Sequence, residues 1–154
     1  MASLQTNKWR FKILDWITQG TAVPTAFYVA LITNTNPPDV DDNVFSDLTE
    51  IAAGNGYTAG GVSLTPGATD FDDITEDDSG DLAYAQIKDI EWIASGGPIP
   101  SSGSPARFAI LTDDNGTQAD REVYHVWDLG GDVVAADTQG ILLRDLQMDI
   151  RLPA

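Results

Sequence analysis

The sequence predicts a mainly β protein, an antiparallel β-sandwich of about six to seven strands with one N-terminal helix. Short apolar runs alternate along the chain with segments rich in Gly, Pro, Asn, Asp and Ser, a pattern typical of all-β domains. Helical periodicity is found in one segment, close to the N-terminus. With 154 residues the chain is expected to form a single domain. We divide it into a basic segment and helix at residues 1–20 and a β-sandwich at residues 21–154.

The helix is predicted over residues 4–19. Apolar side chains recur there at a spacing that places them on one helix face, and they are Trp9, Ile13, Trp16 and Ile17. Gly20 stands where a helix commonly ends, and Pro24 prevents its continuation. The run AFYVALIT that follows, residues 26–33, is apolar throughout and rich in aromatic and branched residues. Such a run predicts a strand buried on both faces.

The other strands are predicted from further apolar or alternating runs. They cover residues 62–65, 82–94, 107–112, 122–129, 132–136 and 146–152. In the last run Leu146, Met148, Ile150 and Leu152 alternate with polar residues, which predicts one buried and one solvent-exposed face. Gly130-Gly131 is interpreted as the turn of a hairpin, because it separates two of the predicted strands.

Turn-forming residues define the connections. Residues 34–43 are predicted to be a loop, and residues 45–53 one or two helical turns with Ser46 as N-cap. The segment GNGYTAGG, residues 54–61, holds four glycines in eight positions, which indicates tight turns with positive φ around Tyr57. Two longer loops are predicted: an acidic one at residues 70–81 and one rich in Gly, Ser and Pro at residues 95–105.

The charge is negative and unevenly distributed. The net charge is −16, and no Lys or Arg occurs between Lys12 and Lys88, where thirteen Asp and Glu are found. Three of the eight basic residues are Lys8, Arg10 and Lys12. This balance argues against binding to nucleic acid or to an anionic membrane. The sequence contains no Cys, no apolar stretch long enough to span a membrane and no recognisable signal peptide, so we expect a soluble protein.

Nothing in the sequence selects a catalytic set. The single histidine, His125, lies in the apolar run VYHVW, where we expect a partly buried residue satisfied by a neighbour. One His without Cys supports a zinc site poorly. The glycines of residues 54–61 lack the Lys-Ser/Thr that follows a phosphate-binding loop. The four tryptophans are interpreted as core residues rather than a sugar-binding face. We therefore predict no enzymatic activity.

The acidic segment offers hard oxygen ligands of the type that calcium prefers. They belong to Asp70, Asp72, Asp73, Glu76, Asp77 and Asp78. The segment TDFDDITEDDSGD does not have the spacing of an EF-hand loop, because the Gly at the sixth position and the Glu at the twelfth are absent. Two interpretations stay open: a site for a cation such as Ca²⁺, or a solvated loop with no ligand. No other cofactor is expected.

Four segments in order along the chain resemble one family of proteins. They read QGTAVPTAFYVALITNTNP, FSDLTEIAAGNGYTAGGVSLT, PARFAILTDD and VVAADTQGILLRDLQMDIRL. The order resembles small virion structural proteins of tailed bacteriophages, the capsid decoration or cement proteins that are sometimes labelled tail-fibre-like. The resemblance implies a β-sandwich that assembles, often as a homotrimer, on a larger protein shell. It carries no catalytic residues. The insertions at residues 70–81 and 95–105 depart from the pattern.

Two functions follow as expectations. In the first, the chain is a capsid cement protein, made in the host bacterial cytoplasm and located on the capsid exterior, where it binds the major capsid protein and neighbouring copies of itself. The contact is placed on Lys8, Arg10 and Lys12, which would meet an acidic capsid surface, with Trp9 as aromatic anchor. An equally weighted reading has Trp9 and Phe11 covering the sandwich core instead.

In the second, the chain is a tail- or fibre-associated module that recognises a glycan on the host surface. The exposed loops at residues 70–81 and 95–105 would then hold the binding site. The two functions predict different positions and copy numbers in the virion, because cement proteins cover the head shell and fibres are few.

Overall fold

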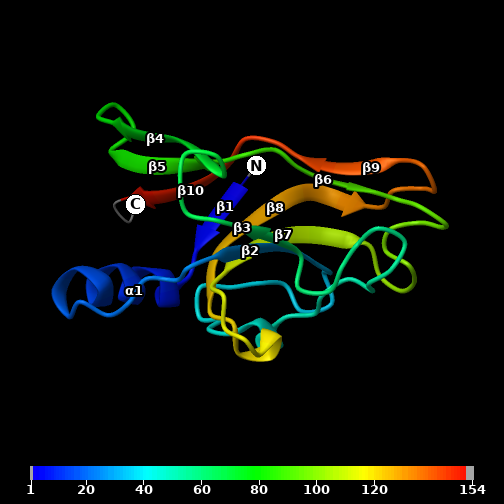
Figure 1. Ribbon diagram of the computed structural model, residues 1–154, viewed down its shortest axis with the longest axis horizontal. Helices are drawn as coiled ribbons and strands as arrows, with labels where there is room; N and C mark the ends of the chain where they lie inside the picture. Colours follow the sequence, from blue (N-terminus) through cyan, green and yellow to red (C-terminus); the bar gives the residue numbers. More distant parts are fainter. Residues whose placement is uncertain (1, 152–154) are drawn as a thin grey trace.

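The computed structural model describes residues 2–151, and it is mainly β, as predicted. The described chain forms ten strands in three sheets, one α-helix and two 3₁₀ turns, and every strand pair is antiparallel (Figure 1). The number of strands exceeds the predicted six to seven. Two segments assigned to the helix and to a loop are strands, residues 140–143 form an unpredicted strand, and one predicted strand is divided, whereas two other predicted strands are joined into one.

The largest sheet has five strands in the order β1-β8-β7-β2-β3. Their bounds are Ala2–Gln5 for β1, Val123–Val133 for β8, Ala106–Thr112 for β7, Phe27–Ile32 for β2 and Val62–Leu64 for β3. As predicted, β2 is buried on both faces. Leu31 belongs to the main core, and Ile32 to a smaller cluster on the other face that Phe45 and Leu48 cover.

Two smaller sheets face the main core from the other side. One has three strands, β10 (Leu146–Arg151), β5 (Leu82–Ile87) and β4 (Phe71–Asp77), and the other pairs β6 (Ile90–Ile93) with β9 (Gly140–Leu143). They lie end to end along one side of the five-stranded sheet in Figure 1. The main core joins Leu31 and Leu64 of the large sheet to Ile87 and Trp92 of the small ones.

The acidic segment is a strand, so the prediction of a loop at residues 70–81 is wrong. Residues 71–77 form β4, which pairs with β5 from Phe71↔Ile87 to Asp77↔Leu82. β4 is an edge strand, and most of its acidic side chains face solvent. Charged side chains are compatible with a strand in this position, because solvent rather than a neighbouring layer surrounds them.

Three predicted strands have different bounds from those expected. The strand predicted at residues 82–94 is divided into β5 and β6, which pair with different partners. The predicted hairpin at Gly130-Gly131 is absent, because β8 runs as a single strand from Val123 to Val133. The pairing of β8 with β7 is irregular there, between Ala106 and Phe108, and Gly130 accommodates the irregularity with a φ of +81°.

The helix α1 spans Asn7–Thr18, three residues later at its start than predicted. Residues 2–5 form β1, an edge strand beside β8, and Thr6 caps the helix by accepting a hydrogen bond from the backbone N–H of Trp9. The helical turns predicted at residues 45–53 are reduced to the 3₁₀ turn η1, Phe45–Asp47, with Val44 rather than Ser46 as N-cap. The other 3₁₀ turn, η2, spans Gln118–Asp120.

The glycine-rich segment forms turns with positive φ at all four glycines, as predicted. Gly61 approaches the neighbouring strand so closely that a Cβ atom there would lie 1.9 Å from the carbonyl oxygen of Val29. Tyr57 is buried beneath these turns, where its hydroxyl accepts a hydrogen bond from Leu31 N–H and donates one to Glu50. The carboxylate of Glu50 also accepts a hydrogen bond from Gly60 N–H, so one partly buried network holds the turn.

The last strand departs from its predicted pattern of buried and exposed residues. Leu146 is fully buried, as expected, but Ile150 is half-exposed and Asp149 is buried. Leu152 lies outside the described residues. Asp149 lies inside because its carboxylate meets two polar side chains of the large sheet, Gln5 and His125. The loop predicted at residues 95–105 contains no strand, apart from a single bridge between Ile99 and Ala135.

Candidate functional site

The inner face of α1 is fixed against the large sheet by aromatic side chains. The ring centroids of Trp9 and Tyr124 are 5.5 Å apart, and those of Trp16 and Tyr124 are 5.9 Å apart. Trp9 is only 6% exposed, and Ile13 packs beside it against the core. Trp9 is therefore a core residue rather than an exposed anchor, as the alternative reading expected. The same reading placed Phe11 over the core, and this is wrong, because Phe11 is exposed.

The three basic residues of the helix do not form one surface. The Nζ atoms of Lys8 and Lys12 lie 3.5 and 3.1 Å from the carboxylate of Glu122, at the start of β8. Arg10 is exposed and forms no ion pair within residues 2–151. Of the predicted capsid-binding residues, Arg10 alone therefore presents its full charge to solvent, because Glu122 offsets much of the charge on the two lysines.

The opposite side of α1 carries an apolar surface that the sequence reasoning did not identify. Phe11, Leu14 and Ile17 are 59, 62 and 77% exposed. The prediction that Ile17 shares the buried stripe with Trp9 is therefore wrong, because Ile17 lies at the edge of that stripe and meets solvent. Successive helical residues are rotated by about 100°, so these three side chains lie within about 120° of one another, and Arg10 lies between Leu14 and Ile17. We call Arg10, Phe11, Leu14 and Ile17 the outer face of α1. Three large apolar side chains exposed together are typical of a protein contact surface.

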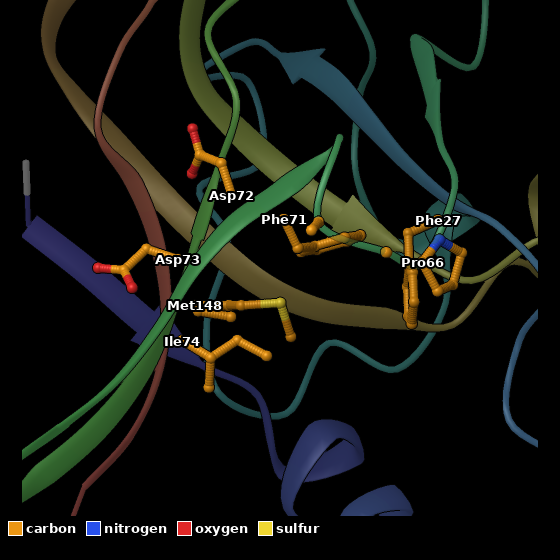
Figure 2. A pocket seen from close by; sticks show the side chains of 10 residues that line it. Phe27, Pro66, Phe71, Asp72, Asp73, Ile74 and Met148 are labelled. Atoms are coloured by element: carbon orange, nitrogen blue, oxygen red, sulfur yellow. The ribbon is translucent and has the colours of Figure 1, made fainter.

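An open apolar groove of about 450 Å³ lies along the three-stranded sheet. Phe27, Phe71 and Pro66 line one side and Ile74 and Met148 the other, as Figure 2 shows. The rings of Phe27 and Phe71 contact each other on that side, with their centroids 5.7 Å apart.

The edge of this groove is acidic. The carboxylates of Asp72 and Asp73 stand at its edge and point away from the apolar side chains (Figure 2), and both residues are exposed. Ile74, the residue that follows Asp73 in β4, lines the groove and is 80% exposed. The groove therefore combines an apolar interior with negative charge at one margin, a combination suited to an apolar segment that carries a basic side chain.

The acidic residues predicted as cation ligands are not gathered into a site. Asp70 is paired with Lys88 and accepts a hydrogen bond from Thr65 N–H, and the Lys88 ammonium holds the pKa of Asp70 below its ordinary value. Asp77 accepts hydrogen bonds from Ser79 and Gly80 at the turn after β4, and the Ser79 hydroxyl is the main cause of its lowered pKa. Within residues 2–151 no group of three or more His, Asp or Glu side chains is arranged to hold a metal ion.

A polar cleft of about 260 Å³ separates α1 from the start of β8 and is lined by Lys12, Asp113, Asp114, Glu122 and Tyr124, among others. Asp114 accepts hydrogen bonds from the N–H and hydroxyl of Thr25, and the hydroxyl lowers the pKa of Asp114. Burial instead raises the pKa values of Asp113 and Tyr124. The polar groups of the cleft are occupied by contacts within the chain, which hold the start of β2 against the β7–β8 connection.

His125 lies in the interior, deeper than predicted. It is fully buried, its ring centroid is 4.8 Å from that of Trp127, and its Nε2 lies 3.5 Å from Oδ1 of Asp149. A base for catalysis must reach the substrate proton within hydrogen-bond distance. This position gives His125 contact with the core and with Asp149 instead.

The described chain contains no helix long and apolar enough to cross a membrane. Comparison of the chain with protein families, with curated proteins and with solved structures gave no match.

Proposed function

We propose that the chain is a non-catalytic structural protein of a bacteriophage virion that decorates and stabilises the capsid shell. It binds the major capsid protein and neighbouring copies of itself, on the capsid exterior. The observation that carries this proposal is the outer face of α1, where three large apolar side chains and one unpaired cation are exposed together on a rigid helix.

The helix is suited to such a contact because its own position is fixed. Thr6 caps it and donates a hydrogen bond to Val123 O at 2.6 Å, and the aromatic contacts of Trp9 and Trp16 hold its inner face. A contact surface that is ordered before binding loses little conformational entropy on association. The partner of the outer face would meet apolar area at its centre and a guanidinium at its margin.

The proposal assigns the basic residues differently from the sequence prediction. Arg10 belongs to the contact surface, while Lys8 and Lys12 stabilise the fold through Glu122. The sequence resemblance to decoration proteins supports the same function. The acidic exterior agrees with a surface that meets solvent and other proteins rather than nucleic acid.

The test is to locate and count the chain in purified particles that contain it. Immunogold labelling should mark the head shell, and gel densitometry should give hundreds of copies. Label on the tail, with few copies, would overturn the proposal in favour of a fibre module that recognises a host glycan.

A binding experiment tests the outer face itself. Particles stripped of the chain are incubated with the wild type or with the variant Phe11→Ser/Leu14→Ser/Ile17→Ser. The variant should bind with lower occupancy, because it lacks the apolar centre of the contact. The control variant Ile93→Ser/Val134→Ser removes two other exposed apolar side chains and should bind as the wild type does. Equal occupancy for all three proteins would exclude the outer face as a contact surface.

A further inference from the structure

The outer face of α1 and the apolar groove are complementary in shape and in charge. The outer face is convex and apolar with one guanidinium, that of Arg10. The groove is concave and apolar, and the carboxylates of Asp72 and Asp73 stand at its edge. The charges of the two surfaces are opposite in sign, because the basic residues of the N-terminal helix are followed by a segment without Lys or Arg that includes β4.

The outer face of α1 and the groove of the same molecule cannot contact each other. The inner face of α1 is held against Tyr124 by Trp9 and Trp16, which fixes the rotation of the helix about its axis. The outer face points away from this contact, since it lies on the opposite side of the helix. Turning Phe11 and Leu14 toward the groove of the same chain would expose the buried Trp9. A contact between the two surfaces therefore requires two molecules.

We propose that the groove of one copy receives the outer face of α1 from a second copy. This rests on the proposed function, which assigns the outer face to a protein contact, and it names the partner of that face. Phe11, Leu14 and Ile17 enter the groove between Phe71 and Met148, and Arg10 pairs with Asp72 or Asp73 at the groove edge. An amphipathic helix in an apolar groove is a recurrent mode of protein recognition.

The contact joins two different patches of the surface. It can close reciprocally between two copies, or it can continue head to tail into a ring. In both arrangements each copy contributes one helix and one groove, so the same variants test both.

The experiment exchanges the charges of the two surfaces. Arg10→Asp reverses the sign of the charge on the outer face of α1. Asp72→Arg/Asp73→Arg reverses the sign of the charge at the groove edge. Molar mass is measured by size exclusion with light scattering and by sedimentation over a series of micromolar concentrations. The wild type should associate. Each variant alone should associate at least about tenfold more weakly, since like charges then face each other. An equimolar mixture should associate again, because the helix of the Arg10→Asp variant meets the reversed groove edge of the other variant, and the unchanged Arg10 of that variant meets the unchanged Asp72 and Asp73 of the first.

Controls separate this contact from general effects of charge and folding. Asp78→Arg changes an exposed residue beyond the end of β4 by two charge units, as each single substitution of the groove edge does, and should leave association as in the wild type. Circular dichroism checks the fold of every variant. If the groove double variant does not fold, Ile74→Ser replaces it, because the Ile74 side chain is 80% exposed and its removal should weaken association without disturbing the core.

The results also distinguish this inference from the proposed function. A wild type that stays monomeric at all concentrations, or a mixture that does not associate, would overturn the contact between copies, even if the chain still binds the capsid. Association that follows the charge pattern, with no binding to particles, would support the contact and contradict the decoration function.

Discussion

Nε2 of His125 and Oδ1 of Asp149 lie 3.5 Å apart in the interior of the protein, on strands of two different sheets. The same carboxylate oxygen accepts a hydrogen bond from the side-chain amide of Gln5 at 3.3 Å. Three strands, β1, β8 and β10, therefore meet at one buried carboxylate. A buried polar cluster of this kind is costly to break, because each remaining group is left without the partner that replaced water.

Asp149→Ala is expected to destabilise the fold strongly. The substitution removes the carboxylate that faces His125 and Gln5, and we expect a loss of about 3 kcal/mol in the free energy of unfolding. For a chain of this size that corresponds to a fall in melting temperature of roughly 6–12 °C. Thermal circular dichroism measures it. Gln147→Ala, an exposed neighbour in β10, serves as control. Equal melting temperatures for the two variants would show that the buried cluster contributes little.

Gly61→Ala is expected to be more destabilising than Gly103→Ala. Both glycines have positive φ, +77° and +75°, so both substitutions place alanine in an unfavourable backbone conformation. Only at Gly61 would the new Cβ also collide with the neighbouring strand, at Val29, whereas nothing lies within 4 Å at Gly103. Urea unfolding should give a loss of about 1 kcal/mol for Gly103→Ala and at least about 3 kcal/mol for Gly61→Ala. Similar losses would mean that the turn can move away from β2.

The stability of the fold should fall in acid, and Asp70 should contribute to the fall. The pKa of Asp70 is lowered by Lys88, that of Asp114 by the Thr25 hydroxyl, and that of Asp128 by Gly130 N–H. A carboxyl group whose pKa is lower in the folded than in the unfolded chain stabilises the fold above its unfolded pKa. That contribution is lost as the pH falls through the folded pKa. Stability should therefore decrease below about pH 4.

Asp70→Asn tests this assignment. The variant should be less stable than the wild type at pH 7, and the difference should shrink as the pH is lowered, because the wild-type carboxylate becomes protonated. Urea unfolding at a series of pH values measures the difference. For Asp78→Asn, at an exposed position, the difference in stability from the wild type should not change with pH. If the free energies of unfolding of Asp70→Asn and of the wild type differed by the same amount at every pH, the role of the Asp70 charge would be contradicted.

Calcium is expected to leave the melting temperature unchanged. The acidic side chains of β4 are spread along an exposed strand, and Asp77 in that strand and Asp70 just before it are engaged by groups of the chain itself. A cation that bound the folded state alone would raise its stability. Melting curves with millimolar calcium and with EDTA should coincide. A rise of several degrees with calcium would establish a cation site in this segment.

The buried strands could be predicted because their sequences leave few alternatives. The run at residues 26–33 is apolar throughout, so it fits only an element covered on both sides, and β2 is such a strand. The glycines of residues 54–61 were equally informative, since side chains at their φ values are strained. Both predictions depended on local properties of the chain.

The segments that were predicted wrongly depend on partners distant in sequence. Acidic composition suggested a loop for residues 70–81, but pairing with β5 makes most of that segment an edge strand. The burial of Asp149 follows from its meeting with Gln5 and His125, which the alternation of its own strand could not indicate. Composition describes solvent preference, whereas tertiary contacts decide which residues actually meet solvent.

The candidate site could be predicted only in part. Apolar residues occupy two stripes of α1, one with Trp9, Ile13 and Trp16 and one with Phe11 and Leu14. Periodicity alone does not tell which stripe faces the sheet, and Ile17 lies at the border between them. The groove could not be predicted, because its walls come from three separate parts of the chain: β2, the β3–β4 connection with β4 and β5, and β10.

The position of β4 at the edge of its sheet has a consequence for the behaviour of the protein at high concentration. Its outer N–H and C=O groups have no neighbouring strand among residues 2–151, so they could template the addition of a strand from another molecule. The carboxylates of Asp72, Asp73 and Glu76 make two such edges repel each other. These carboxylates thus disfavour aggregation through the sheet edges, and this protection would weaken as they become protonated.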